Sequence, residues 1–291
     1  MKSLRNEPEI TVADAEGVAG QMALSRQHPE IQRMQTYFRM QLVAGWHIPP
    51  GASVLEIGCG QGDMTAALAH AVGSAGHVLA VDIAPPGYGG PLTVGQSADY
   101  LKSMPLGERI DFRLQCNLLD PSISFPADRF DYVVLAHCSW YFASLDEFRR
   151  ILLRIHPWAK HLCYAEWEMA PNTLDQVAHL LAVLIQGEVA AFQEHSTGNV
   201  RTPFSRTRCK QLLRETGWHV TEESRVDSTQ LMDAEWEIAN CLGSSLSETA
   251  LSAMPSNLLE LLSSQKDTLR TLAGSGKNRS LSSILFAAER Y

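Results

Sequence analysis

The feature that most constrains the fold of this chain is a glycine-rich turn near residue 60. The segment 54–63 reads VLEIGCGQGD, so an apolar strand pattern runs directly into three alternating glycines and then into a helical pattern. Glycine adopts backbone angles that are closed to other residues and lets the main chain approach a ligand. The first N–H groups of the following helix have no partner within that helix. The turn therefore predicts a strand-turn-helix unit that binds a ligand through its main chain.

The spacing of the glycines narrows the class of ligand. The spacing is G-x-G-x-G, whereas nicotinamide and flavin enzymes carry G-x-G-x-x-G, and no G-K-[ST] follows as in a phosphate-binding Walker loop. Glu56 stands two residues before the first glycine, and Asp82 ends the next apolar run. Asp82 lies near the separation at which α/β nucleotide sites place a ribose-binding carboxylate. The pattern disfavours a nicotinamide oxidoreductase and indicates another nucleoside-containing ligand.

From residue 49 onward, short apolar runs alternate with helical stretches, which is typical of β-α-β units and a mainly parallel sheet. A helix is expected before them, over Pro29–Trp46. We expect strands in the segments VLEIG, HVLAVD, RIDFRLQ, FDYVVLAH, HLCYAEW, WHVTEESRV and LSSILFAAERY. The fold class is α/β, doubly wound, with helices on both faces of the sheet.

The chain divides into a polar beginning and one large domain. Residues 1–28 show little periodicity and are predicted to be a flexible N-terminal arm, and residues 29–291 form the domain. Two helical segments, about 171–204 and 228–279, interrupt the strand pattern and are predicted to form a helical lid.

Composition limits the partners and the compartment. Hydrophobic residues make up 45% of the chain and charged residues 19%, and the formal net charge is −8. A polyphosphate backbone would be repelled, so no nucleic-acid partner is expected. The six cysteines have no C-x-x-C spacing, and the chain begins without an apolar leader and has no run of eighteen apolar residues. We expect free thiols, a cytoplasmic location, no membrane partner and no metal.

The glycine turn resembles motif I of the class I S-adenosylmethionine-dependent methyltransferases, [DE]-x-G-x-G-x-G, which residues 56–62 match. The resemblance covers about residues 45–170. It implies a seven-stranded Rossmann-like sheet that binds S-adenosyl-L-methionine. In this family the glycine turn cradles the methionine part of the cofactor, and the acidic residue, here Glu56, supports the turn.

Two further segments resemble the family's motifs. Asn117, in QCNLLD, occupies the place of an acid that usually lies beside the adenine amino group; its amide oxygen could accept that bond, and Asp120 is the alternative. The segment FDYVVLAHCSWYF resembles the motif whose strand end faces the transferable methyl group. The predicted cofactor-binding residues are Glu56, Gly58, Cys59, Gly60, Gly62, Asp82, Ile83, Asn117, Leu118 and His137.

The residues after the fourth and fifth strands are the candidates for the reaction site. His137 could be a general base, since an ordinary imidazole titrates near neutrality, or a strand-end histidine with a structural partner. Trp140 and Tyr141 could form an aromatic wall for a flat substrate or simply pack in the core. Glu166 and Trp167 are candidate substrate residues, with a surface cluster as the alternative.

The expected function is methyl transfer from S-adenosylmethionine to an oxygen, nitrogen or carbon of a small, partly apolar organic acceptor, by in-line displacement. The abundant Leu, Ala and Met of the two lid segments favour an apolar pocket for that acceptor. The alternative is a non-catalytic S-adenosylmethionine-binding partner or regulatory protein. The acceptor and the oligomeric state are not readable from the chain.

Overall fold

The computed structural model describes residues 10–193, 198–243, 254–274 and 276–291. The chain splits into two compact units, residues 1–116 (unit 1) and residues 117–291 (unit 2). Within the described residues there are seven strands, three in unit 1 and four in unit 2. The strands are mainly parallel and helices accompany them in both units, so the predicted fold class is confirmed.

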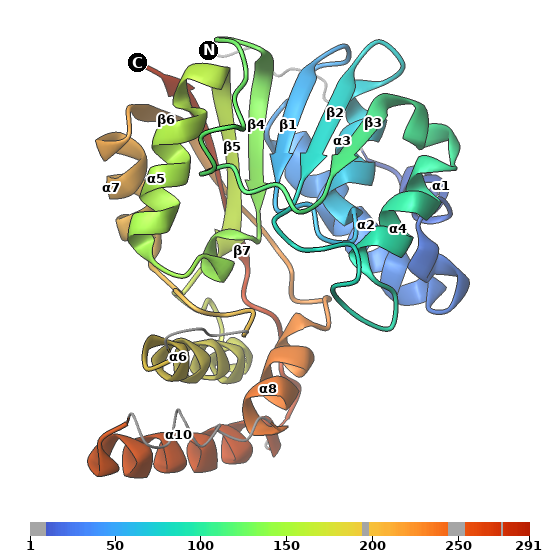
Figure 1. Ribbon diagram of the computed structural model, residues 1–291. Coiled ribbons are helices and arrows are strands. Elements are labelled where there is room, and N and C mark those ends of the chain that lie inside the picture. The colour runs from blue at the N-terminus through green and yellow to red at the C-terminus, as the bar shows by residue number, and fades with distance from the viewer. Residues whose placement is uncertain (1–9, 194–197, 244–253, 275) are drawn as a thin grey trace, which may run out of the picture. The chain divides into compact units, whose positions relative to one another are not determined.

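Unit 1 is built on three parallel strands, ordered β3-β2-β1 (Figure 1). The side chains of β1 and β2 are largely buried, as the continuous apolar runs predict for strands covered on both faces, whereas β3 is more exposed. The elements are α1 (Val12–Ala19), η1 (Ala23–Arg26), α2 (Pro29–Gly45), β1 (Ser53–Ile57), α3 (Asp63–Val72), β2 (His77–Val81), α4 (Val94–Lys102), η2 (Pro105–Arg109) and β3 (Ile110–Arg113).

The predicted flexible arm does not hold for residues 10–28, and residues 1–9 lie outside the described residues. Thr11 begins α1 with a capping box, in which its hydroxyl and the Asp14 carboxylate bond each other's backbone N–H groups. Ala15, Val18 and Met22 are buried. A capped first turn and a few apolar contacts therefore order a segment whose periodicity is too short to predict a helix.

Unit 2 has four strands in the order β4-β5-β7-β6. β4 and β5 are parallel, whereas β7 is antiparallel to both of its neighbours. The elements are β4 (Phe130–Ala136), η3 (Ser139–Tyr141), α5 (Leu145–Ile155), η4 (His156–Trp158), β5 (Ala159–Trp167), η5 (Leu174–Gln176), α6 (Val177–Ala191), α7 (Arg206–Glu215), β6 (Trp218–Val226), α8 (Asp233–Gly243), α10 (Ser256–Gly274) and β7 (Ser283–Arg290).

The helices of unit 2 form two groups (Figure 1). α5 and α7 lie beside the strands, whereas α6, α8 and α10 lie together beyond the strand ends. These three helices share a small core of their own, which includes Ala182, Ile185, Ile238, Leu262 and Leu269. The two segments predicted as a lid thus form one helical group, which we call the cover.

One segment of the cover, Leu174–Ala191, is long and apolar enough to cross a membrane when judged by length and composition alone. Its buried residues pack against α8 and α10, and 44% of the segment is buried in the structure. Core helices of globular proteins have the same composition, because a helix packed on several sides is apolar around most of its circumference.

Candidate cofactor site and reaction wall

The glycine turn of unit 1 has the backbone that its sequence predicts. Gly58, Gly60 and Gly62 have φ values of 76°, 49° and 90°, all in the left-handed region that favours glycine. Gly62 is also the N-cap residue of α3. A Cβ atom at Gly60 would meet no described atom within 4 Å, so the space beside this part of the turn is open.

Asp82, at the end of β2, fastens the glycine turn. One carboxylate oxygen accepts the backbone N–H of Gly60 at 2.8 Å, and the other accepts the N–H of Ala84 at 2.8 Å. Bonds to a charged carboxylate are stronger than neutral ones. Each oxygen has a second lone pair, so the group retains the capacity to accept hydroxyl groups of a ligand. The next residue, Ile83, leaves 63% of its surface exposed.

Glu56 supports the same turn from inside β1. The side chain is buried, and its carboxyl accepts the hydroxyl of Thr65 from α3 at 2.6 Å. Burial, the largest cause, raises the pKa of Glu56 to about 8, and nearby Asp82 and Asp63 raise it further. At neutral pH the Glu56 carboxyl is therefore largely protonated, and it supports the turn as a neutral hydrogen-bonding group. Thr65 was not identified from the sequence, because a threonine within a helix carries no signal of its own.

The start of α3 has a second support that sequence reasoning missed. Gln32, buried on α2, donates to the Asp63 carboxylate at 2.7 Å. Cys59, between the first two glycines, is also buried.

In unit 2, Asn117 and Leu118 follow the third strand as predicted. Asn117 is exposed, and its amide oxygen accepts the backbone N–H of Leu119 at 3.0 Å. Leu118 is buried. The alternative acid, Asp120, accepts the N–H and hydroxyl of Ser122 at 2.8 Å each, and these bonds lower its pKa.

His137 stands where β4 ends, with a φ of 51°. Its backbone N–H donates to the carbonyl of Ala165 on β5 at 2.9 Å. Its Nε2 lies 2.8 Å from the hydroxyl of Ser283 on β7, and its ring centroid lies 4.5 Å from that of Trp167. The structure therefore brings together two of the predicted reaction-site residues, His137 and Trp167, and adds Ser283, which the sequence did not suggest.

The other residues predicted for the reaction site, Trp140, Tyr141 and Glu166, differ in how exposed they are. Trp140 is 2% exposed, and its indole N–H has no hydrogen-bond partner among the described residues. Tyr141, the next residue, is 45% exposed. Glu166 is buried, and its carboxylate accepts hydrogen bonds from Ser139 and from the backbone of Trp167. Its contacts point into the protein rather than toward a surface cluster.

A buried histidine lies next to Trp167. His179, on α6, accepts the backbone N–H of Leu281 on its Nδ1 at 3.0 Å. Its ring packs edge-on against Trp167 at 5.5 Å. Burial lowers the pKa of His179 to about 3, so the imidazole is neutral. This contact joins the cover to the end of β5.

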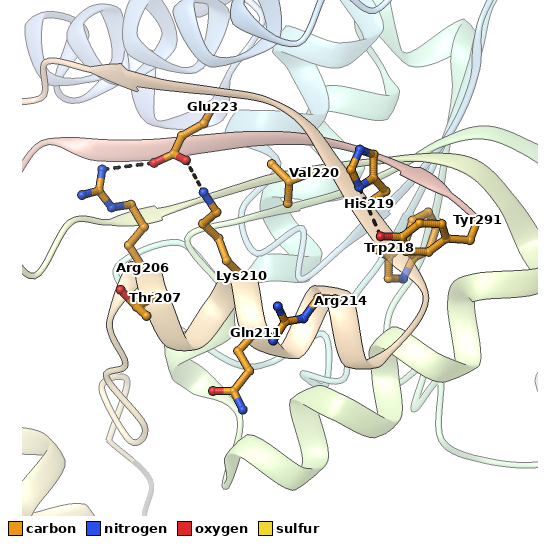
Figure 2. Close-up of a pocket in the computed structure, with 10 residues that line it drawn as sticks. All are labelled: Arg206, Thr207, Lys210, Gln211, Arg214, Trp218, His219, Val220, Glu223 and Tyr291. Atoms are coloured by element: carbon orange, nitrogen blue, oxygen red, sulfur yellow. Dashed lines mark hydrogen bonds and ion pairs between the residues drawn. The ribbon is translucent and has the colours of Figure 1, made fainter.

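A groove of about 630 Å³ lies elsewhere in unit 2, between α7 and β6 (Figure 2). Its basic side chains are partly used within the protein, because Glu223 accepts from Arg206 at 3.1 Å and from Lys210 at 2.7 Å. None of the residues predicted for the cofactor or the reaction lines this groove. The sequence-predicted site is therefore distinct from it.

The comparisons with known proteins agree with the geometry of the turn. Residues 54–161 match the family model described as "Methyltransferase domain". Over 96% of its length the chain is 34% identical to a cyclopropane-fatty-acyl-phospholipid synthase-like protein from Lactobacillus casei, covering 100% of that chain with a TM-score of 0.83. The chain belongs to the S-adenosylmethionine-dependent methyltransferases.

Two named methyltransferases match a shorter part of the chain. Methyltransferase phomM' from Diaporthe leptostromiformis is 37% identical over a third of this chain (33%), which covers 29% of the fungal protein. The ubiquinone/menaquinone biosynthesis C-methyltransferase UbiE from Vibrio vulnificus is 31% identical over 36% of this chain, covering 37% of the bacterial protein. The chain thus spans well under two thirds of the length of these relatives.

Proposed function

We propose that this methyltransferase-family chain transfers the methyl group of S-adenosylmethionine to an oxygen, nitrogen or carbon of a small, partly apolar organic acceptor. The observation that carries the proposal is the glycine turn with left-handed φ at Gly58, Gly60 and Gly62, tied by the Gly60 N–H to Asp82 at 2.8 Å. Such a turn presents main chain to a ligand at the strand ends, where α/β sheets bind nucleosides.

The residues of unit 1 fit the cofactor. Open space adjoins Gly60, so a bound group can approach the main chain there. The Asp82 carboxylate is held in place by two N–H groups and keeps lone pairs for the ribose hydroxyls. Ile83 offers an exposed apolar side chain for the adenine ring. These three features support S-adenosylmethionine as the cofactor.

When bound, S-adenosylmethionine supplies a methyl group already activated by a positively charged sulfur. What remains for the protein is to align the acceptor and to exclude water, which can lower a barrier by several kcal/mol. His137 is the proposed base for acceptors that must lose a proton. The Nε2 of His137 lies 2.8 Å from the hydroxyl of Ser283. To act as a base, His137 must therefore either bind the acceptor in place of the serine or accept the proton on its other ring nitrogen.

The class of acceptor is inferred from charge and from the cover. The net charge of −8 disfavours nucleic acid. The cover helices are rich in Leu and Ala, and α6 carries a neutral histidine against Trp167, a surrounding that favours an apolar or aromatic molecule. We propose a small organic acceptor that is methylated in the cytoplasm.

The test begins with binding. Calorimetry with S-adenosylhomocysteine should show one site per chain, and NADH should show none; binding of NADH alone would overturn the proposal. The protein is then incubated with methyl-labelled S-adenosylmethionine and a metabolite extract, and a labelled product heavier by one methylene is expected. Cofactor binding without any labelled product would favour the non-catalytic alternative.

A further inference from the structure

The further inference concerns Glu166, a buried acid on β5 that the proposed reaction does not use. Its side chain is 2% exposed. One carboxylate oxygen accepts the Ser139 hydroxyl at 2.7 Å and the Ser139 backbone N–H at 3.2 Å. The other oxygen accepts the backbone N–H of Trp167 at 3.0 Å. The Glu166 carboxylate therefore bonds the turn after β4 through Ser139 and the backbone of the next residue on its own strand, Trp167.

These two segments carry the two members of the ring pair described above. Ser139 lies two residues after His137, and Trp167 is the residue whose ring packs against His137 at 4.5 Å. Glu166 thus connects the turn that bears the histidine to the strand end that bears the tryptophan.

The turn itself needs such support. His137 has a φ of 51°, a left-handed conformation that is unfavourable for a residue with a Cβ. On its other side the turn is held by the carbonyl of Trp140, which accepts the backbone N–H groups of Arg201 at 2.8 Å and Thr202 at 3.1 Å. Strain of this kind persists only where the surroundings determine the conformation.

The electrostatics of Glu166 differ from those of Glu168, which follows the end of β5. Glu168, also buried, pairs with Arg206 at 3.4 Å and Arg225 at 3.2 Å. Among the described residues no lysine or arginine forms an ion pair with Glu166. Its contacts are hydroxyl and backbone groups, and the Ser139 hydroxyl in turn bonds the Tyr164 phenol at 2.8 Å.

A buried acid without a cation contributes little to stability, because loss of hydration opposes its hydrogen bonds. A well-packed neutral side chain would serve the fold as well. What the carboxylate provides is acceptor capacity in two directions, which fixes the geometry of both partners.

We propose that Glu166 is a positioning residue that holds the His137 turn and Trp167 in register, and so sets the orientation of the His137 imidazole. The catalytic meaning of that orientation rests on the proposed function. The orientation itself can be measured on the protein alone.

The test is the NMR signature of the His137 ring in the full chain, assigned by its loss in His137→Asn. The Trp167 indole shifts these signals away from the values of an exposed histidine. In Glu166→Gln one oxygen is replaced by an NH2 group that cannot accept, so at least one of the two connections is lost. The His137 signals should move toward exposed values. Unchanged signals in a folded Glu166→Gln protein would overturn the proposal.

Two further variants make the outcome decisive. Glu168→Gln removes the charge of a buried acid just after the same strand, so it should lower stability but leave the His137 signals in place. Equal shifts in both variants would reduce Glu166 to a general structural role. If Glu166→Gln does not fold, Ser139→Ala removes the 2.7 Å bond to Glu166, together with the 2.8 Å bond to the Tyr164 phenol, and should shift the signals in the same direction. Unchanged His137 signals in Ser139→Ala would then reject the proposal.

Failure of this proposal is distinguishable from failure of the proposed function. S-adenosylhomocysteine binding to the wild-type chain tests the function without reference to Glu166. In Glu166→Gln the affinity for S-adenosylhomocysteine should stay within about twofold, while methyl transfer to an acceptor found in the extract should fall by roughly 10- to 100-fold, as expected for a misplaced reacting group.

Discussion

The glycine turn of unit 1 and the His137 turn of unit 2 are supported in a similar way but are made of different residues. Each follows the end of a parallel strand, and each is supported by a buried glutamate that accepts a hydroxyl, Thr65 to Glu56 at 2.6 Å and Ser139 to Glu166 at 2.7 Å. The first turn places glycine at its left-handed positions, whereas the second places a histidine there.

Because of this difference, the first turn presents a surface of backbone atoms, whereas the second turn presents a surface of side-chain atoms. Glycine lowers the conformational cost of the first turn and leaves open space beside it. The second turn keeps an imidazole at a strained position and depends on bonds from β5 and from residues 201–202. A main-chain surface suits recognition of a constant cofactor, and a side-chain surface suits chemistry that varies with the acceptor.

The largest expected effect comes from removing the Asp82 carboxylate, which holds the glycine turn in place. Asp82→Ala leaves the N–H groups of Gly60 and Ala84 without their charged acceptor, at about 1.5 kcal/mol or more for each bond. We expect a loss of about 3 kcal/mol in the free energy of unfolding and at least about a tenfold weaker affinity for S-adenosylhomocysteine, measured by denaturation and calorimetry.

The matched control for that variant is Asp111→Ala. Asp111 lies on β3 in the same unit, is exposed, and pairs only with surface groups, His77 at 3.1 Å and Lys102 at 3.5 Å, among the described residues. Exposed pairs contribute little. If both alanine variants bound S-adenosylhomocysteine like the wild type, Asp82 would have no part in the cofactor site.

The next prediction concerns the buried hydrogen bond between Thr65 and Glu56 that supports the glycine turn. Thr65→Val keeps the shape of the side chain but removes the hydroxyl that donates to Glu56 at 2.6 Å. A buried acceptor that loses its donor costs about 1–3 kcal/mol. Urea denaturation should show a loss of about 2 kcal/mol. Equal stability of Thr65→Val and wild type would mean that the Glu56 carboxyl finds another donor.

The two turns also differ in how far they were predictable from the sequence. The strand, the glycines and the helix start of the first turn are contiguous, so local pattern identified Glu56, Gly60 and Asp82 together. The second turn depends on Ser283 and Glu166, which are far from His137 in the chain and become neighbours only when the sheet forms. No local pattern encodes such pairings.

The same distinction between local and long-range signals explains which helices could be predicted from the sequence. α5 has a clear local signal, because Ser144 caps it and its apolar residues recur at helical spacing. The helices at the beginning of the chain were missed, because α1 spans only eight residues and its order comes from burial of Ala15 and Val18. Most of the strands were predictable because they are short apolar runs, whereas β3 and β6 each have only one buried residue.

A smaller effect distinguishes the two glutamates by pH. Burial raises the pKa of Glu56 to about 8 and that of Glu166 to about 7, from an ordinary value of 4.5. The folded state therefore holds these protons where the unfolded chain has lost them. The free energy of unfolding should fall as pH rises from about 4.5, until Glu166 ionises near 7 and Glu56 near 8.

Between pH 7 and pH 8 the remaining slope comes mainly from Glu56. Denaturation at the two pH values should show a fall of about 1 kcal/mol in wild type. Glu56→Gln should remove most of that fall, leaving the smaller contribution of Glu166, whereas Glu166→Gln should retain most of it. If the two variants gave the same slope, the two glutamates would not differ in the folded protein.

The smallest effect is expected at a place that neither turn uses. Arg214 lines the groove between α7 and β6, is exposed, and forms no ion pair among the residues that the structure describes (Figure 2). Arg214→Ala should change the free energy of unfolding by less than about 0.5 kcal/mol, as for an ordinary surface substitution. Its affinity for S-adenosylhomocysteine should equal that of the wild type. A loss of affinity comparable with that of Asp82→Ala would show that the basic groove, and not the glycine turn alone, contributes to binding, and the contrast between the two turns would then be incomplete.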